Sequence, residues 1–306
     1  MYLYIDFKIV ILYNYEKEDG NLREWGETFR LLRKERDFTL KSMAEGIISF
    51  SYLSKFEQGK SDITLNNFIR LIERLNITLD EFLFVNHVST THYVELFHSI
   101  SLAYSKNDKI TLQNLLTEER NIYEESGIIY HKCNFIMIAA IIQDINESFF
   151  IPQSDIDFLV DYIVKCSFWT AYEVSLLGNS LTLFSDDLLL VLLNEVTKRL
   201  KEYKVSRRNI RDLIALIENA CFIFLRRKNV TEARLLSNLL DSFLEPSYFF
   251  EKTRKFFIDG IIYIYEGKRE EGIEKAKQAI EIMGMMDKEF ADDHRVELSN
   301  FLELIK

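Results

Sequence analysis

Proline, glycine and cysteine are scarce in this sequence of 306 residues, which holds 2 prolines, 10 glycines and 3 cysteines. An all-β fold needs many tight turns built from proline and glycine, so the composition argues against one. Neither GxxxxGK[ST] nor GxGxxG occurs, which argues against a glycine-rich phosphate-binding loop. Hydrophobic residues make up 48% and charged residues 28% of the chain, a balance that excludes a disordered protein. The length predicts two domains.

The net charge is −10, from 38 lysines and arginines against 48 aspartates and glutamates. Over the whole chain this acidity argues against a nucleic-acid partner. The charge is unevenly distributed, however: residues 21–79 hold 10 basic and 8 acidic residues, a net +2, and the rest of the chain carries −12. The acidity therefore does not exclude DNA binding by residues 21–79. It predicts modest non-specific affinity and dependence on two half-sites.

The three cysteines, Cys133, Cys166 and Cys221, are far apart and form no CxxC motif. Their odd number and their apolar surroundings predict buried, reduced thiols, and we expect a cytoplasmic protein. The apolar stretch over residues 1–15 lacks the basic start and the cleavage site of a signal peptide, and it is shorter than the ~20 residues that span a bilayer. We expect residues 1–20 to be a non-essential extension.

Helical periodicity begins after residue 21. Between residues 21 and 85, apolar residues recur three and four positions apart in five short stretches. Most of these stretches follow a residue that favours a helix start, namely Thr39, Ser49, Thr64 or Thr78. Glu81, three residues after Thr78, predicts a capping box. The pattern indicates a compact five-helix domain at residues 21–85, followed by a polar linker at 86–91.

Residues 39–59 have the pattern of a helix-turn-helix. Apolar residues predict that two short helices bury their inner faces against each other: Met43, Ala44, Leu53 and Phe56. The second helix then exposes small, hydrogen-bonding or cationic side chains, which suit the major groove of DNA. Backbone N–H groups at helix starts and lysine side chains can in addition bind the DNA phosphates. The predicted DNA contacts are therefore Thr39, Lys41, Ser49, Ser51, Tyr52, Lys55, Gln58 and Lys60. The alternative is a solvated face without a partner. Arg33 and Glu57 are expected to form a structural pair.

From residue 92 to residue 306 the sequence predicts long amphipathic helices joined by short loops, which is typical of antiparallel helix pairs stacked into a solenoid. The predicted helices are 90–105, 108–125, 128–147, 154–166, 168–179, 185–203, 207–227, 230–245, 250–266, 269–284 and 287–305. The last pair resembles a tetratricopeptide repeat, because small residues at Gly260, Ala276 and Ala279 permit close helix packing and Gly267 permits the turn.

Two asparagines in apolar helices, Asn179 and Asn219, have amides that need hydrogen-bond partners. Amides inside a repeat groove can bind a peptide backbone whatever its sequence. The alternative is an ordinary amide between helices or at a helix cap. Together with candidate neighbours, the predicted peptide-binding residues are Tyr172, Asn179, Asn219, Phe222, Arg226 and Tyr263. For Arg226 the alternative is a role at the end of its helix, where a cation interacts favourably with the helix dipole.

No residue pattern indicates catalysis. Three histidines lie close together: His87, His92 and His98. Their spacings fit neither HExxH nor an i,i+4 pair, so we expect an exposed linker there in place of a metal site, and His131 stands alone. The adjacent acids at 186–187 and 292–293 point about 100° apart on a helix and do not converge on one substrate atom. We therefore expect no enzyme activity, no metal and no cofactor.

Two segments carry a family resemblance. The run FRLLRKERDFTLKSMAEG and the later run SYLSKFEQGKSDITLNNFIRLIERLNITLDEF resemble the N-terminal domain of Rgg/GadR/MutR-family transcription regulators, a variant of the phage-repressor (Xre) helix-turn-helix. The segment from Trp169 to Asn179 resembles part of the same family's C-terminal domain. The resemblance covers nearly the whole chain after residue 21. It implies an all-α protein: a five-helix, lambda-repressor-like domain followed by a right-handed tetratricopeptide-like repeat domain at 92–306.

The resemblance also implies partners. The family's peptide-pheromone-responsive members are homodimers that bind promoter DNA and a short signalling peptide. This chain departs from its relatives in three places. Tyr52 stands where many relatives have glutamine, and Leu181 and Thr182 stand where relatives that respond to short hydrophobic peptides carry an arginine. Leu65 replaces a cysteine that links some dimers. The first departure implies a different operator sequence and the second a different type of ligand. The third implies that no disulfide crosslinks the dimer through this position.

The sequence thus predicts a regulator that binds specific DNA and senses a short peptide through its repeat domain. A rival hypothesis is a repeat scaffold that inhibits a partner protein and does not bind DNA. Measurable affinity for promoter DNA at low salt distinguishes the two, since only the first requires it.

Overall fold

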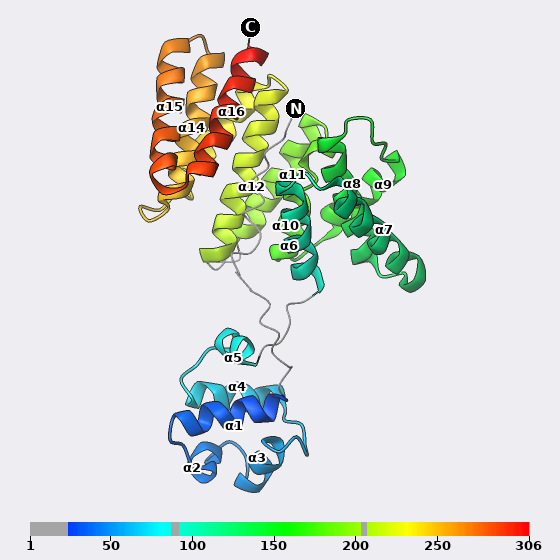
Figure 1. The fold of residues 1–306 in the computed structure, drawn as a ribbon, viewed down its shortest axis with the longest axis vertical. Coiled ribbons are helices and arrows are strands. Elements are labelled where there is room, and N and C mark those ends of the chain that lie inside the picture. Colours follow the sequence, from blue (N-terminus) through cyan, green and yellow to red (C-terminus); the bar gives the residue numbers. More distant parts are fainter. Residues whose placement is uncertain (1–23, 87–91, 203–206, 306) are drawn as a thin grey trace. The chain divides into compact units, whose positions relative to one another are not determined.

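The computed structural model of the chain describes residues 24–86, 92–202 and 207–305. Within these ranges it contains sixteen α-helices, one short 3₁₀ helix and no strand (Figure 1). The all-α prediction is confirmed. The predicted extension at residues 1–20 and the linker residues after Asn86 lie outside the described residues.

The helices form two compact units, which divide at the start of α6, between His92 and Tyr93. The first unit holds α1 (Trp25–Glu35), α2 (Leu40–Ala44), α3 (Phe50–Phe56), α4 (Leu65–Arg74) and α5 (Leu79–Val85). Each predicted helix start is a helix cap, since its side-chain oxygen accepts a backbone N–H of the first turn: Thr39, Ser49, Thr64 and Thr78. The predicted capping box of Glu81 is present.

The core of the first unit is aromatic. Phe68 lies at its centre, with its ring centroid 4.9 Å from Phe82, 6.2 Å from Phe56 and 6.5 Å from Phe29. These rings come from α1, α3, α4 and α5, so one cluster joins four helices. The Thr28 hydroxyl also donates a hydrogen bond to the amide oxygen of the buried Asn86. This bond connects α1 to the residue that follows α5. Asn86, predicted to begin the linker, is thus part of the packing of this unit.

Gly26 sets the distance between α1 and α3. A Cβ atom at this position would stand 1.9 Å from the carbonyl oxygen of Phe56 and 2.7 Å from its carbonyl carbon. The two backbones therefore touch directly, and no residue with a side chain fits. The sequence pattern does not predict this contact, because Gly26 stands in an otherwise ordinary helical pattern.

The second unit is a run of helices: α6 (His92–Ser105), α7 (Lys109–Ser126), α8 (Ile129–Ile145), α9 (Gln153–Lys165), α10 (Ala171–Gly178), η2 (Leu181–Leu183), α11 (Asp186–Glu202), α12 (Arg207–Arg226), α13 (Val230–Leu240), α14 (Phe249–Tyr265), α15 (Arg269–Met286) and α16 (Lys288–Leu304). All eleven helices predicted for this unit are present, and among the described residues η2 is the one element that was not predicted. Neighbours in sequence pack as pairs, most extensively α7 with α8, α12 with α13 and α14 with α15. α12 also packs against α10 and α14, which places it centrally (Figure 1).

The α14–α15 pair has the close contact that its small residues predict. A Cβ on Gly260 would lie 2.8 Å from the backbone of Ala276, and a Cβ on Gly272 would lie 2.5 Å from the carbonyl oxygen of Gly260. Gly267 has a φ of +87° in the turn between the helices. These three features agree with the expected repeat-like packing of the final pair.

Candidate DNA-binding surface and ligand site

The turn between α2 and α3 is held by two arginines of α4. The Arg74 guanidinium donates to the carbonyl oxygens of Met43 at 2.9 Å and Glu45 at 2.5 Å, and Arg70 donates to that of Gly46 at 2.9 Å. These carbonyls end α2, where no helical N–H reaches them. The two arginines therefore fix the angle of the helix-turn-helix. The sequence pattern does not predict these contacts, because the two charges fit an exposed face of α4.

All eight predicted DNA contacts lie on the surface of the first unit: Thr39, Lys41, Ser49, Ser51, Tyr52, Lys55, Gln58 and Lys60. Along α3 the pattern alternates as expected, since Leu53 and Phe56 are buried while Ser51 and Lys55 are exposed. α2 and α3 lie next to each other (Figure 1). The structure thus assembles an exposed, hydrogen-bonding and cationic face on the second helix of the motif.

Besides Thr39 and Ser49, which cap their helices, three of these side chains have intramolecular partners. The Tyr52 hydroxyl donates to the carbonyl oxygen of Asp62 at 2.6 Å, so its only proton is used within the protein. Lys60 donates to the Gln58 amide oxygen at 2.8 Å, and the Gln58 amide nitrogen donates to Ser54 at 2.9 Å. Tyr52 is therefore suited to apolar contact or to accepting a hydrogen bond. For Ser51 and Lys55 the structure shows no partner among the described residues.

Arg33 and Glu57 form the predicted structural pair. Both guanidinium nitrogens on one edge of Arg33 donate to the Glu57 carboxylate, at 2.5 and 2.7 Å, and a third donates to the carbonyl oxygen of Phe38 at 2.6 Å. Both residues are buried, and the hydrogen bond to Glu57 raises the pKa of Arg33. The pair joins α1 to the end of α3 and to the loop before α2.

Replacing Arg33 by alanine is expected to lower the local stability of the first unit by about 3–5 kcal/mol, because it leaves the buried Glu57 charge uncompensated. Hydrogen exchange of the α1 and α3 amides in the full chain measures the loss. Arg30→Ala, an exposed arginine on the same helix, is the matched control and should change stability by no more than about 0.5 kcal/mol. Equal protection in the two variants would contradict the assigned role.

In the second unit, three predicted ligand residues share one face of α12: Asn219, Phe222 and Arg226, at spacings of three and four. Asn219 is 3% exposed, and its amide oxygen accepts from Arg254 of α14 at 3.4 Å. Arg254 forms a buried ion pair with Glu218 at 3.1 Å. This face therefore carries polar and charged groups inside an apolar core, which a stable fold alone does not require.

Arg226, the last residue of α12, connects this face to α16. Its guanidinium pairs with Glu297 of α16 at 2.5 Å and lies 5.9 Å from the ring centroids of both Phe222 and Phe301. Burial raises the pKa of Glu297, while Arg226 lowers it. Burial likewise raises the pKa of Asp144, at the end of α8, to about 7, against the opposing effects of Thr182 and Arg226. The charge of Arg226 therefore acts on both carboxylates, and Glu297 forms the ion pair with it.

The structure places the other predicted ligand residues elsewhere. Asn179 follows α10, is 5% exposed, and donates to the Met137 sulfur at 3.6 Å. Tyr172 belongs to a different cluster, since its hydroxyl donates to the Asn134 amide oxygen at 2.9 Å. Tyr263 is half-buried, and three cations lie within 5.2 Å of its ring centroid: Arg234, Lys268 and Lys275. Asn219, Phe222 and Arg226 thus form one face of α12, whereas Tyr172, Asn179 and Tyr263 lie outside it.

Cys133 and Cys221 are buried as expected, whereas Cys166 is only half-buried. None of the three forms a disulfide. Burial raises the pKa of Cys133 to about 12 and that of Cys221 well above its usual value. Both thiols are therefore protonated at neutral pH and poor nucleophiles.

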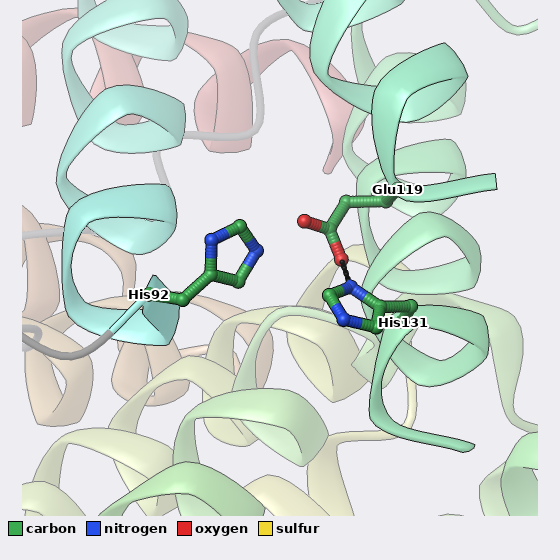
Figure 2. Close-up of side chains that lie close together, drawn as sticks. All are labelled: His92, Glu119 and His131. Atoms are coloured by element: carbon green, nitrogen blue, oxygen red, sulfur yellow. Dashed lines mark hydrogen bonds and ion pairs between the residues drawn. The ribbon is translucent and has the colours of Figure 1, made fainter. Parts of the chain in front are cut away.

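The expectations for the histidines need correction. His92 and His98 lie on α6 and not in a linker, while His87 falls outside the described residues. His131 is not isolated, because its Nδ1 lies 2.8 Å from the buried carboxylate of Glu119 (Figure 2). No short sequence motif predicts this contact, because it joins α7 to α8 across twelve residues.

Models of known protein families match segments of both units. A family model described as the HTH-type transcriptional regulator Rgg, C-terminal domain, matches residues 112–294, and a helix-turn-helix model matches residues 29–82. The fold and the α2–α3 motif define the chain as a helix-turn-helix, DNA-binding transcription regulator. It belongs to the Rgg family, whose members are regulators and not enzymes. No helix among the described residues is long and apolar enough to cross a membrane.

Solved structures share the fold over most of the chain. A putative transcriptional regulator from Listeria monocytogenes EGD-e is 27% identical, with a TM-score of 0.81 over 92% of this chain and 98% of its own. The SHP pheromone receptor Rgg2 of Streptococcus dysgalactiae is 23% identical, with a TM-score of 0.74 over 90% and 99%. The PrgX/cCF10 complex is 16% identical, with a TM-score of 0.70 over 92% of both chains.

Proposed function

We propose that this protein is a homodimeric, peptide-responsive transcription regulator that acts in the cytoplasm on promoter DNA. The observation that carries the peptide-sensing part is the α12 face, on which Asn219, Phe222 and Arg226 lie together within the segment that matches the Rgg C-terminal domain. Two solved relatives support it by their descriptions, one as a pheromone receptor and one as a complex with cCF10.

The chemistry of this face suits a short peptide. Asparagine amides offer both a donor and an acceptor, which match the peptide backbone independently of side chains. Phe222 and Phe301 offer apolar surface, and Arg226 offers a planar cation for a carboxylate. Arg226 is held by Glu297, so a bound acidic group would exchange one carboxylate partner for another. The ligand would act by binding one of two states of the chain more tightly than the other.

In the DNA-binding half, α3 would enter the major groove and present Ser51 and Lys55 to it. Two such units, one from each protomer, would read half-sites about one helical turn apart. Dimeric reading also fits the mild charge of residues 21–79, because a net +2 gives one unit little non-specific attraction to DNA.

Asn179→Ala, a change at the end of the helix α10 that packs against α12, is expected to abolish or strongly reduce the ligand response while leaving DNA binding intact. The Asn179 amide reaches a methionine sulfur, which is a weak acceptor, so its loss costs the fold little. The readout is a reporter strain grown with and without spent culture medium, alongside a band-shift assay. The control is Asn238→Ala, an exposed amide on α13. An unchanged response in Asn179→Ala would count against this residue as a ligand contact.

A further inference from the structure

Three side chains from three consecutive helices meet where α6 begins. His92 is the first residue of α6, Glu119 lies in α7 and His131 in α8, and one ligating atom of each lies within 4.8 Å of the others (Figure 2). We propose that these residues form a binding site for a divalent transition-metal ion, Zn²⁺ in the first place. The proposal is independent of the DNA and peptide sites.

The ligand set is the first reason. Two imidazoles and one carboxylate are ligands that Zn²⁺ takes readily, and three protein ligands leave the fourth tetrahedral position for water. His92 is exposed while Glu119 is 1% exposed, so an ion can enter from solvent and reach an anchored carboxylate. In Figure 2 the His92 ring faces Glu119 and His131 across a short gap.

The geometry requires only a small movement. With Zn–ligand distances of about 2.0–2.1 Å, neighbouring ligand atoms of a tetrahedral site stand about 3.4 Å apart. Glu119 Oε2 and His131 Nδ1 are 2.8 Å apart and would separate by about 0.6 Å as a metal ion replaced the proton between them. The remaining approach, about 1.4 Å from the 4.8 Å limit, falls to the exposed His92 side chain, which can rotate.

Neighbouring side chains position the ligand residues through hydrogen bonds and a contact between rings. The Asn134 amide donates to Glu119 Oε2 at 2.8 Å, and its oxygen accepts from the Tyr172 hydroxyl at 2.9 Å. The Tyr172 ring in turn lies 5.8 Å from the ring of Tyr93, the neighbour of His92. Such outer partners orient metal ligands and tune their affinity. Tyr172, predicted from sequence as a ligand contact, would thus support the metal site.

Zn²⁺ would also bind a buried carboxylate. The Glu119 side chain is 1% exposed and contacts His131 and Asn134. A divalent ion would add its charge to these contacts and join the start of α6 to α7 and α8. Its binding should therefore raise the thermal unfolding midpoint of the second unit, because a ligand that binds only the folded state stabilises it.

The test is calorimetric titration of Zn²⁺ into the full chain, freed of metal by a chelator and carrying no histidine tag. We expect one Zn²⁺ per chain, at least a tenfold weaker affinity in His92→Ala, and unchanged affinity in His98→Ala, an exposed histidine on the same helix. Glu119→Gln keeps the shape of the carboxylate and should also bind weakly. Co²⁺ should give the intense visible absorption of a four-coordinate site in the wild type and lose it in His92→Ala.

His92→Ala changes an exposed residue, so its folding is not at risk even if Glu119→Gln unfolds. Failure of the wild type to bind Zn²⁺ would overturn the proposal. Equal affinity in the wild type and in His92→Ala would overturn it too, because the ion would then be held by other residues, such as the cysteines. Neither result bears on DNA binding or on the response to culture medium, so this proposal fails separately from the proposed function.

Discussion

Replacing Gly26 by alanine is expected to disrupt the DNA-binding unit and to abolish DNA binding. The new methyl group would stand 1.9 Å from the carbonyl oxygen of Phe56, and the obstacle is backbone, which cannot rotate away. Ordinary overpacking of a core costs about 1–3 kcal/mol because side chains adjust. Here α1 and α3 must separate, which also breaks the Arg33–Glu57 pair that joins them.

The measurement is hydrogen exchange of the α1 and α3 amides in the full chain, with a band-shift assay beside it. The matched control is Gly46→Ala in the same unit. Gly46 has a φ of +71° and nothing within 4 Å of an added Cβ, so alanine there meets only backbone strain of about 1–2 kcal/mol. If Gly26→Ala keeps the exchange protection of Gly46→Ala, the close contact between α1 and α3 is refuted.

Lys55→Ala is expected to weaken operator binding at least tenfold without changing the fold. Lys55 is exposed in the last turn of α3, so no core contact is lost with it. Each direct contact to DNA contributes about 1–3 kcal/mol, and a dimer loses the contact in both half-sites. The loss should shrink at high salt if the contact is to phosphate, because fewer counterions are then released.

A band-shift titration over several salt concentrations measures the effect. Lys34→Ala, an exposed lysine at the end of α1 and outside the α2–α3 motif, removes the same charge from the same unit and serves as the control. Wild-type affinity in Lys55→Ala, or an equal loss in both variants, would remove Lys55 from the DNA-reading face.

Much of the fold was predictable because it depends on local sequence. Helix starts such as Thr39 and Thr78 and apolar spacing within single helices are encoded over three to four residues, and these predictions were confirmed. The Arg33–Glu57 pair was also predicted, across 24 residues, because the helix-turn-helix pattern placed the two residues on helices of one small domain.

The missed features all depend on contacts between elements. Gly26 matters only because α3 crosses it, and Arg74 matters only because the end of α2 lies beneath it. The same holds for Glu297, which reaches Arg226 across 71 residues. Periodicity predicts which face of a helix a residue occupies, but not which other element packs against that face. The ligand face of α12 was therefore predicted only for the residues on α12 itself.

Mapping of bound DNA across the genome, with and without spent culture medium, tests whether α3 reads DNA under control of a ligand in the repeat unit. We expect discrete sites built of two half-sites, occupancy that changes with the medium, loss of all sites in Lys55→Ala, and medium-independent occupancy in Asn179→Ala. No specific sites in the wild type, together with a co-purifying partner protein, would contradict this mechanism and favour a repeat scaffold that acts through protein contacts.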